Sequence, residues 1–236
     1  MSDVHTVRSF DEELAAINAG LNAMGKLADA MIDAAIRALL KGDQELAQTV
    51  IIDDRRMDVH QRDIDERAVT LIAKRQPMAQ DLRFVVGAIR IASDLERIGD
   101  LAKSIAKRAT ASTGAKGPMH GLKAMAKLAR THLSGVLGAL AARQAEALAA
   151  VRDDDERIDE LYTGVFRELL TYMMEDPRSI SSCTQLLFCA KNLERIGDHV
   201  TNIAEDAYYM ITGNKLPIWR PKLDESGMQA NGGAES

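Results

Sequence analysis

The chain has 236 residues, enough for one large domain or two small ones with hydrophobic cores. Its net charge of −5 and pI of about 5.6 argue against a nucleic-acid-binding protein, which needs a basic surface against phosphates. Hydrophobic residues make up 46% of the chain but aromatics only 4%, so Ala, Leu, Ile and Met dominate and favour helices. No alternating run of β-branched residues predicts a strand, and we expect an all-α protein.

Neither a targeting segment nor a membrane span is predicted. The first residues lack the apolar core of a signal peptide. The longest nearly apolar run, Leu133–Ala142, is about half the roughly 20 residues that a span needs. Cys183 and Cys189 lie on one predicted helix at a spacing that points them to different faces, and we interpret both as reduced core thiols. These features together predict a cytoplasmic protein.

The first part of the chain predicts three long helices. Starting at residue 10, apolar residues recur at alternating spacings of three and four, which is typical of a helix that packs along a seam. Gly42 suits the left-handed position at the end of this helix, and Asp43 can cap the next one. Three antiparallel helices joined by short turns form a bundle. The predicted helices cover residues 10–41, 44–74 and 79–109.

A short polar segment with Gly and Pro, residues 110–119, separates this bundle from a second one. The helical pattern then repeats over residues 120–141, 144–175 and 179–212, and Gly213 gives a C-cap signal. The predicted domains are residues 1–112 and 113–215, followed by a tail, 216–236, that lacks periodicity and is predicted to be disordered. Two interpretations of Trp219 in this tail stay open: it docks on the bundle, or it is exposed.

One short motif occurs twice. Asp94–Asp100 reads DLERIGD and Asn192–Asp198 reads NLERIGD, so six residues recur after 192 − 94 = 98 positions. Each copy lies midway along the third predicted helix of its half. A repeat at the same place in both halves indicates that the whole bundle was duplicated. The predicted fold is therefore two three-helix bundles related by internal duplication.

Each motif carries two acids four residues apart, which face the same side of a helix. Glu96 and Asp100 repel each other mildly, so a cation, a basic partner or water is expected to offset the repulsion. The second helix of each half carries a similar pair, and four oxygen donors from two helices suit Mg²⁺, Ca²⁺, Mn²⁺ or iron. The predicted metal ligands are Asp54, Asp58, Glu96 and Asp100 in the first half and Asp155, Asp159, Glu194, Asp198 and Asn202 in the second.

The two acidic turns differ beyond the shared motif. Asn202 and Glu205 continue the face of the second turn, whereas Lys103 and Lys107 stand among the acids of the first. We therefore expect the second half to bind metal in preference to the first. The alternative is a solvated face in both halves, as is usual for charged helix surfaces. The Glu-x-x-His spacing of a ferritin-type oxidase is missing, and His199 points away from the acids.

A glycine precedes the second acid of each motif. Gly99 and Gly197 stand inside helices, where glycine costs up to about 1 kcal/mol relative to alanine. The missing side chain lets a neighbouring helix approach closely, or lets a ligand reach the backbone. We favour close helix packing.

Two stretches resemble the PhoU family of phosphate-signalling proteins. They are QPMAQDLRFVVGAIRIASDLERIGD at residues 76–100 and NLERIGDHVTNIAEDAYYMITGN at residues 192–214, and the resemblance covers about residues 8–214. It implies two three-helix bundles with pseudo-two-fold symmetry, usually in a homodimer. It also implies that the acids named above bind a divalent metal, since members bind Fe, Zn, Mg or Mn at these turns. The first half departs from the family, with LAKSIAKRA where a run like HVTNIAEDA is usual, so a full cluster is not expected there.

The resemblance further implies a cytoplasmic accessory protein that negatively regulates phosphate uptake and the phosphate-starvation two-component response. Members link the ATPase subunit of the phosphate ABC transporter to the phosphate sensor histidine kinase. They are peripheral to the membrane only through these partners.

The residues themselves favour an adaptor without enzymatic activity. The sequence has no GxxxxGK[ST] loop and no arrangement of Ser, His, Asp or Cys that predicts a nucleophilic site. One alternative is a carboxylate-bridged metal-dependent hydrolase or oxidase, which requires an open coordination position and turnover. Another is a regulatory domain of a sodium-coupled phosphate transporter, which differs only in its partner.

Overall fold

The structure, a computed structural model, describes residues 2–111, 117–153 and 156–216. All regular elements in these residues are helices, and the described ranges contain no strand, so the predicted all-α class is confirmed. The elements are α1 (Ser2–Lys41), α2 (Gln44–Arg75), α3 (Ala79–Ala111), α4 (His120–Ala142), α5 (Ala145–Asp153), α6 (Glu156–Glu175), the short 3₁₀ helix η1 (Pro177–Ser179) and α7 (Ile180–Thr212).

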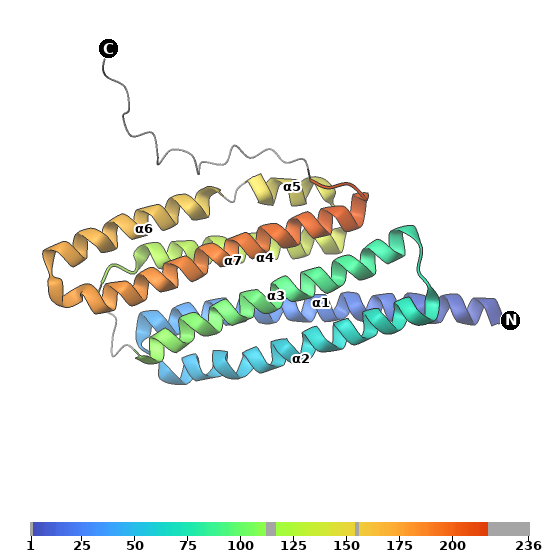
Figure 1. Ribbon diagram of the computed structural model, residues 1–236, viewed down its shortest axis with the longest axis horizontal. Coiled ribbons are helices and arrows are strands. Elements are labelled where there is room, and N and C mark those ends of the chain that lie inside the picture. Colours follow the sequence, from blue (N-terminus) through green and yellow to red (C-terminus); the bar gives the residue numbers. More distant parts are fainter. Residues whose placement is uncertain (1, 112–116, 154–155, 217–236) are drawn as a thin grey trace, which may run out of the picture.

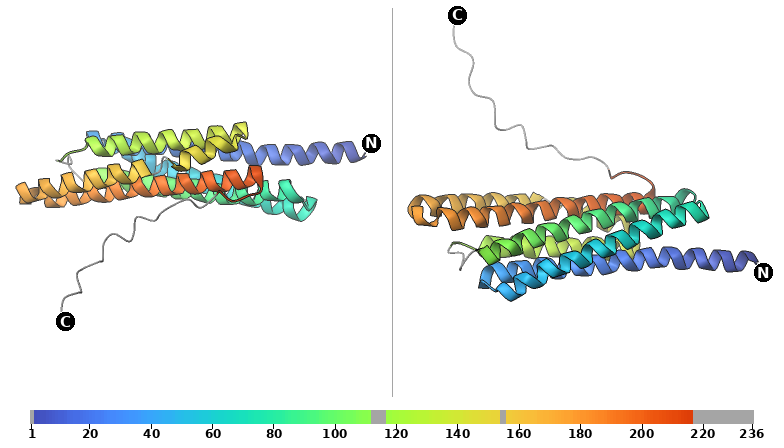
Figure 2. Two further views of the ribbon diagram at one scale, coloured as in Figure 1. Left: turned by 90° about the horizontal axis from the view of Figure 1, so that it is seen from above. Right: turned by 60° about the horizontal axis from the view of Figure 1, so that its bottom comes forward.

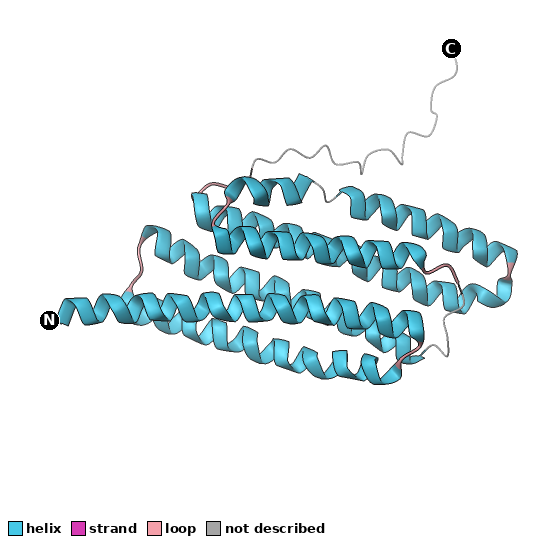
Figure 3. Cartoon of the chain, turned by 180° about the vertical axis from the view of Figure 1, so that it is seen from behind, coloured by secondary structure: helices cyan, strands magenta, loops and turns pink. Residues whose placement is uncertain are grey.

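Two helical bundles lie side by side. α1, α2 and α3 pack on one another, and α4 packs with α5, α6 and α7. Contacts of α3 with α7 and of α1 with α4 join the two bundles. In Figure 1, α2, α3, α7 and α6 follow one another across the front, and α1 and α4 lie behind them. Figure 2 shows these two layers from above, and Figure 3 shows the molecule from behind. The predicted pair of bundles is confirmed.

The apolar stripes of the long helices form the core. On α1, Ile17, Met24 and Ala28 are completely buried, at the spacing that the sequence predicts for a packing seam. Ile98 and Ile196, the isoleucines of the two LERIGD turns, are also completely buried. Each such side chain contributes about 1.5–3 kcal/mol by leaving water. The isoleucines therefore anchor the motifs in the core, while the acids of the motifs are at least partly exposed.

The helix ends follow the predicted capping rules. Gly42 has φ of 67°, and the Asp43 side chain accepts a hydrogen bond of 2.9 Å from the backbone N–H of Leu46. Gly213 ends α7 with φ of 75°. Arg143 ends α4 with φ of 55°, and it stands 143 − 42 = 101 residues after Gly42. The first helix of each half thus ends in the same left-handed geometry, although only one of them uses glycine.

Two helices differ from the sequence prediction. α1 begins at Ser2 instead of residue 10, since the residues before the apolar seam contain neither Gly nor Pro to stop a helix. The helix predicted over residues 144–175 is described as α5, which ends at Asp153, and α6, which begins at Glu156. Residues 154 and 155 between them lie outside the described part of the chain. The predicted disordered tail also lies outside it from residue 217 onward.

Two further expectations concern the cysteines and the membrane. Cys183 and Cys189 are both completely buried and neither forms a disulfide, which confirms their place in the core. Of the helices that the structure describes, none is both long enough and apolar enough to cross a membrane.

α3 and α7 occupy equivalent places in the two halves and pack against each other. Arg90 Nη1 lies 3.3 Å from Asp206 Oδ1, and the Arg108 guanidinium lies 4.4 Å from the centre of the Phe188 ring. With the repeat offset of 98 residues, Arg90 is equivalent to Phe188, and Asp206 is equivalent to Arg108. The two contacts therefore join equivalent pairs of positions, as expected if a rotation exchanges the two halves. A pseudo-two-fold axis therefore passes between the two LERIGD turns.

A single arginine fastens α4 to α1 in the rear layer. The guanidinium of Arg130 donates two hydrogen bonds to the Asp29 carboxylate, at 2.8 and 2.9 Å, and another to Asp33. Such a forked pair is stronger and geometrically more specific than a single ion contact. Close packing adds to it, because a Cβ built on Gly25 would overlap Leu137 of α4.

Candidate functional site: the paired acidic turns

The first acidic turn lies between α2 and α3 and already contains a cation. Lys103 Nζ lies 2.6 Å from Asp54 Oδ2 on α2 and 2.6 Å from Asp100 Oδ1 on α3. Asp54 is only 7% exposed, so the ammonium neutralises a carboxylate that has little water around it. Burial opposes the charge of Lys103, but its hydrogen bonds to Asp100 and Asp54 outweigh burial and raise its pKa. The predicted acids of two helices meet here, joined by the chain's own lysine.

The other two acids of this turn also lie near one another. Burial raises the pKa of Glu96, and the charges of Asp100 and Asp58 raise it further, while Arg97 opposes the shift. Arg97 Nε lies 3.7 Å from Glu96 Oε2, and its Nη1 lies 3.6 Å from Asp100 Oδ2. The side chain of Arg97 is 61% exposed, so this contact screens the acids only weakly. The surroundings of Glu96 therefore disfavour its charged form.

The second acidic turn lies on α7, next to α6. Lys191 Nζ lies 2.6 Å from Glu194 Oε1 and 5.4 Å from the centre of the Tyr162 ring on α6. Burial opposes the charge of Lys191, but the hydrogen bond to Glu194 and the charges around it, including that of Asp198, raise its pKa. The other carboxylate oxygen of Glu194, Oε2, is buried and has no hydrogen-bond partner among the described residues. This turn therefore holds a carboxylate whose second oxygen is unsatisfied.

The two lysines hold their acids differently. Lys103 joins two helices and its side chain is 22% exposed, whereas Lys191 contacts an acid of its own helix and is 49% exposed. The residue of α7 that corresponds to Lys103 is Thr201, which is buried and carries no charge. Breaking the ion pair of Lys191 and exposing its ammonium to water costs less free energy than doing so for Lys103, because an exposed ion pair contributes at most about 1 kcal/mol. Lys191 is therefore the easier of the two lysines to displace from its acid.

The acids predicted on the helix before α7 are only partly described. Asp159 lies in the first turn of α6 and is exposed, while Asp155 lies outside the described residues. Within residues 2–111, 117–153 and 156–216, no group of three or more His, Cys, Asp and Glu side chains stands close enough to hold a metal ion. The described residues alone therefore do not form a metal centre in either half, and the predicted ligand Asp155 lies outside them.

Asn202 lies in a different setting from Glu194. It lines a polar cavity of about 330 Å³ between α3 and α7, together with Arg90, Asp94, Glu205 and Asp206. Burial raises the pKa of Asp206, Arg90 opposes this shift, and the charges of Asp94 and Glu205 add to it. The acidic groups that the sequence aligns along α7 thus divide between the α6 side and the α3 side of the helix.

The first motif also contacts the residue that follows the second motif. His199 Nδ1, just after the second motif, lies 2.8 Å from Oδ1 of Asp94, the first residue of the first motif. Both side chains are mostly buried, at 19% and 17% exposure. His199 therefore packs across the boundary between the halves, consistent with its predicted direction away from the acids.

Gly99 lies where three helices meet. A Cβ built on it would stand 3.3 Å from Cγ of Met57 on α2 and 3.6 Å from Cε of Met31 on α1. Gly197, its counterpart, is buried on α7. At Gly99 the geometry favours close helix packing over access of a ligand to the backbone.

Sequence reasoning missed two of the contacts that shape these turns. It treated Lys103 as a residue that lowers the local acidity, and gave it no role in joining α2 to α3. It gave no role to Arg130, yet Arg130 stands 130 − 29 = 101 residues after Asp29, the same offset that separates Gly42 from Arg143. Aligning the first helices of the two halves at that offset makes Arg130 and Asp29 equivalent, and their contact in the structure places them at the pseudo-two-fold axis.

Comparison with known proteins identifies relatives of both halves. The family model described as PhoU domain matches residues 21–109 and again residues 122–207. A phosphate-specific transport system accessory protein PhoU homolog from Rhizobium meliloti is 53% identical over 227 residues, covering 95% of this chain and 96% of the relative. A protein of the same name from Caulobacter vibrioides is 49% identical over 224 residues, covering 93% of this chain and 97% of the relative.

Solved structures agree over nearly the same extent. A crystal structure of PhoU from Pseudomonas aeruginosa has a TM-score of 0.83 and 36% identity, and the match covers 87% of this chain and 100% of that one. The phosphate transport system regulatory protein PhoU from Streptococcus pneumoniae has a TM-score of 0.82 and 32% identity, with 88% and 99% coverage.

Proposed function

The chain belongs to the PhoU family, and from this membership we propose that it restrains phosphate uptake and the phosphate-starvation two-component response. In this proposal the protein acts in the cytoplasm, as a homodimer and without catalysis. It binds the ATPase subunit of the phosphate ABC transporter on one side and the phosphate sensor histidine kinase on the other. A regulatory role in phosphate transport follows from the family itself, while the two partners and the sign of regulation are the proposed steps.

The observation that carries the proposal is the extent of the match. The relatives from Rhizobium meliloti and Caulobacter vibrioides, both accessory proteins by name, align over more than nine-tenths of this chain and of their own length. Both halves are therefore retained together, as expected if each half contributes to function. The helices α2, α3, α7 and α6 lie next to one another in the front layer (Figure 1), and each carries charged residues of both signs, so we propose this layer as the surface for protein partners.

The test uses the purified chain as bait for purified ATPase subunit and for purified sensor kinase, with an unrelated ABC transporter ATPase as the control prey. We expect capture of the first two and not of the control. In phosphate-replete cells that lack the protein, uptake of labelled phosphate should rise, and the wild-type gene should restore it. Capture of neither partner together with unchanged uptake would refute the proposal.

We further propose that the second acidic turn binds a divalent metal ion, Mg, Mn, Fe or Zn, while the first turn uses Lys103 in its place. The support is Oε2 of Glu194, which is buried and has no hydrogen-bond partner in the part of the chain that the structure describes, the hard oxygen chemistry of the acids around it, and the uncharged Thr201 in place of a lysine. The first turn has no room for a metal ion between Asp54 and Asp100, because the Lys103 ammonium lies between these two carboxylates. The residues that would hold the metal are Asp155, Asp159, Glu194 and Asp198. Asn202, also predicted as a ligand, lines the cavity on the α3 side of α7 instead.

A further inference from the structure

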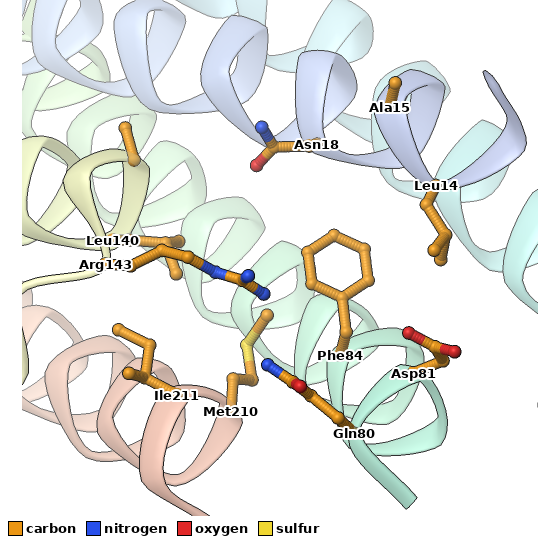
Figure 4. A pocket seen from close by; sticks show the side chains of 11 residues that line it. Leu14, Ala15, Asn18, Gln80, Asp81, Phe84, Leu140, Arg143, Met210 and Ile211 are labelled. Carbon is orange, nitrogen blue, oxygen red and sulfur yellow. The ribbon is translucent and has the colours of Figure 1, made fainter. Parts of the chain in front are cut away.

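A second cavity, also of about 330 Å³, opens where α3 begins and α4 and α7 end. Helices of both halves form its walls, α1 and α3 from the first and α4 and α7 from the second. The walls are mainly apolar, and Figure 4 shows the ring of Phe84 and the side chain of Met210 directed into the space between the helices. The apolar lining residues are Leu14, Phe84, Leu140, Met210 and Ile211.

The wall contributed by α7 is firmly placed. Met210 is 3% exposed, and a Cβ built on Gly87 of α3 would overlap its side chain. The Met210 side chain therefore already packs closely against α3 at Gly87. The opening is a feature of how the two halves pack, and its volume falls within the range of sites that take a small molecule or a large side chain.

Polar groups at this cavity lack partners. Asp81 of α3 and Arg143, at the end of α4, form no side-chain hydrogen bond or ion pair with any described residue, and the same is true of Asn18. Figure 4 shows Arg143 extended toward Phe84 from the α4 side and Asp81 on α3. An apolar cleft edged by an unpaired carboxylate and an unpaired guanidinium suits an aromatic group that carries a hydrogen-bond donor.

We propose that this cavity receives the indole of Trp219 from the chain's own carboxyl-terminal segment. That segment, residues 217–236, follows directly on Leu216, which is 6% exposed. The last turn of α7 supplies Met210 and Ile211 to the cavity wall, so the segment starts beside the opening. Trp219 stands three positions after Leu216, a reach of about 10 Å in an extended chain.

The composition of the segment matches the cavity. Trp219 is the one tryptophan of the chain, and Arg220 follows it, opposite in charge to Asp81. An indole ring buries a large apolar area against Phe84 and leaves its N–H to a carboxylate or amide acceptor. The Arg143 guanidinium is placed to lie over an aromatic face. A docked Trp219 would bridge both halves at this end of the molecule.

Because the chain has a single tryptophan, its fluorescence reports this position alone. In the full-length protein we expect blue-shifted emission and slow quenching by acrylamide. Ala15→Arg places a long charged side chain at the cavity, where Ala15 is exposed on α1, and should shift the emission to the red and raise the quenching constant severalfold. Ala19→Arg, also exposed and one turn further along α1, lies outside the cavity and should leave both unchanged.

Circular dichroism of both variants checks that helix content is retained. An exposed tryptophan in the wild-type protein overturns the proposal, and so does an equal response to Ala15→Arg and Ala19→Arg. Emission that shifts with protein concentration assigns Trp219 to a second copy of the chain, which overturns docking within one chain. None of these readouts depends on phosphate transport partners, so the result is independent of the proposed function.

Discussion

The ammonium of Lys103 lies 2.6 Å from the buried carboxylate of Asp54, on the neighbouring helix. The corresponding place on α7 is held by Thr201, which is uncharged and buried. The two acidic turns therefore differ at the position that supplies an internal cation in the first half, Lys103, and a neutral residue in the second, Thr201. One half carries a permanent internal cation between two helices, and the other leaves its acids to Lys191, a more exposed side chain of the same helix.

Replacing Lys103 by methionine should destabilise the first half. The change leaves Asp54 and Asp100 without their ammonium, at a cost of about 1–3 kcal/mol for a poorly solvated polar group. Thermal unfolding at neutral pH should show a melting temperature lower by several degrees. Lys107→Met, an exposed position one turn further along α3, is the matched control and should change stability by less than about 0.5 kcal/mol.

The same variant makes a prediction about pH. Because the pKa of Lys103 is raised in the fold, its stabilising contribution is complete below the unfolded value of about 10.4 and is lost as pH rises through the folded value. The stability difference between wild type and Lys103→Met should stay constant from neutral pH to about pH 10 and shrink above it. A difference that already vanishes below that range would contradict the assigned role.

Metal binding should be asymmetric between the halves. The double variant Glu194→Ala/Asp198→Ala should lose most of the bound metal, because it removes the acids of the second turn, where Thr201 stands in place of Lys103. Glu96→Ala/Asp100→Ala should lose much less, since Lys103 occupies that turn. Elemental analysis of both proteins, purified without chelator, measures the difference, and equal losses would refute the asymmetry.

Glu96→Gln should stabilise the protein above acidic pH. Burial and the charges of Asp100 and Asp58 raise the pKa of Glu96, so ionisation of Glu96 lowers the free energy of unfolding. That cost is absent below the unfolded pKa of about 4.3 and complete above the folded pKa. Removing the like-charge contact should add about 0.2–0.5 kcal/mol at neutral pH.

Urea unfolding of Glu96→Gln as a function of pH measures this effect. The gain should fade as pH decreases toward about 4, where the wild-type carboxyl group is protonated in both states. Glu66→Gln, an exposed position on α2, serves as the control and should show no comparable gain. A loss of stability in Glu96→Gln at neutral pH would mean that its charge is favourable, against the structure.

Arg130→Met should weaken the junction between the halves. It removes three hydrogen bonds to Asp29 and Asp33 and should cost about 1–3 kcal/mol. Arg130→Lys should cost nearly as much, because an ammonium keeps the charge but cannot form the forked contact. Arg37→Met is the control, since Arg37 is 55% exposed and contacts Asp33 only at 3.4 Å. Denaturant midpoints that are equal in all three variants would contradict this role.

The helices were predictable because their signals are local. The seam on α1, the glycine at position 42 and the cap at Asp43 all lie within a few residues of the feature they determine. The repeated LERIGD motif then showed that one bundle has a copy. The early start of α1 was missed because residues 2–9 lack the apolar seam, although nothing in them breaks a helix.

The contacts of the site were less predictable, because they depend on how neighbouring helices rotate about their axes. The sequence shows that Lys103 lies three residues after Asp100, but not that Asp54 of α2 is on its other side. The sequence also aligns Asn202 with Glu194 and Asp198 on α7. The packing of α3 against α7 instead places Asn202 in a cavity with Asp94. Helix periodicity gives the direction of a side chain only to within about a quarter turn. That uncertainty is enough to leave open which neighbouring helix a residue such as Asn202 faces.

The two cysteines allow a simple labelling strategy. Both are completely buried, and burial raises the pKa of Cys189 to about 12, so little of its reactive thiolate exists at neutral pH. Maleimide dyes should therefore react only slowly with Cys183 and Cys189 in the folded protein. A cysteine introduced at an exposed position of α2 or α6 can then carry a fluorophore on an otherwise unmodified chain. Energy transfer to a labelled ATPase subunit, the proposed partner, would show whether it binds nearer to α2 or to α6.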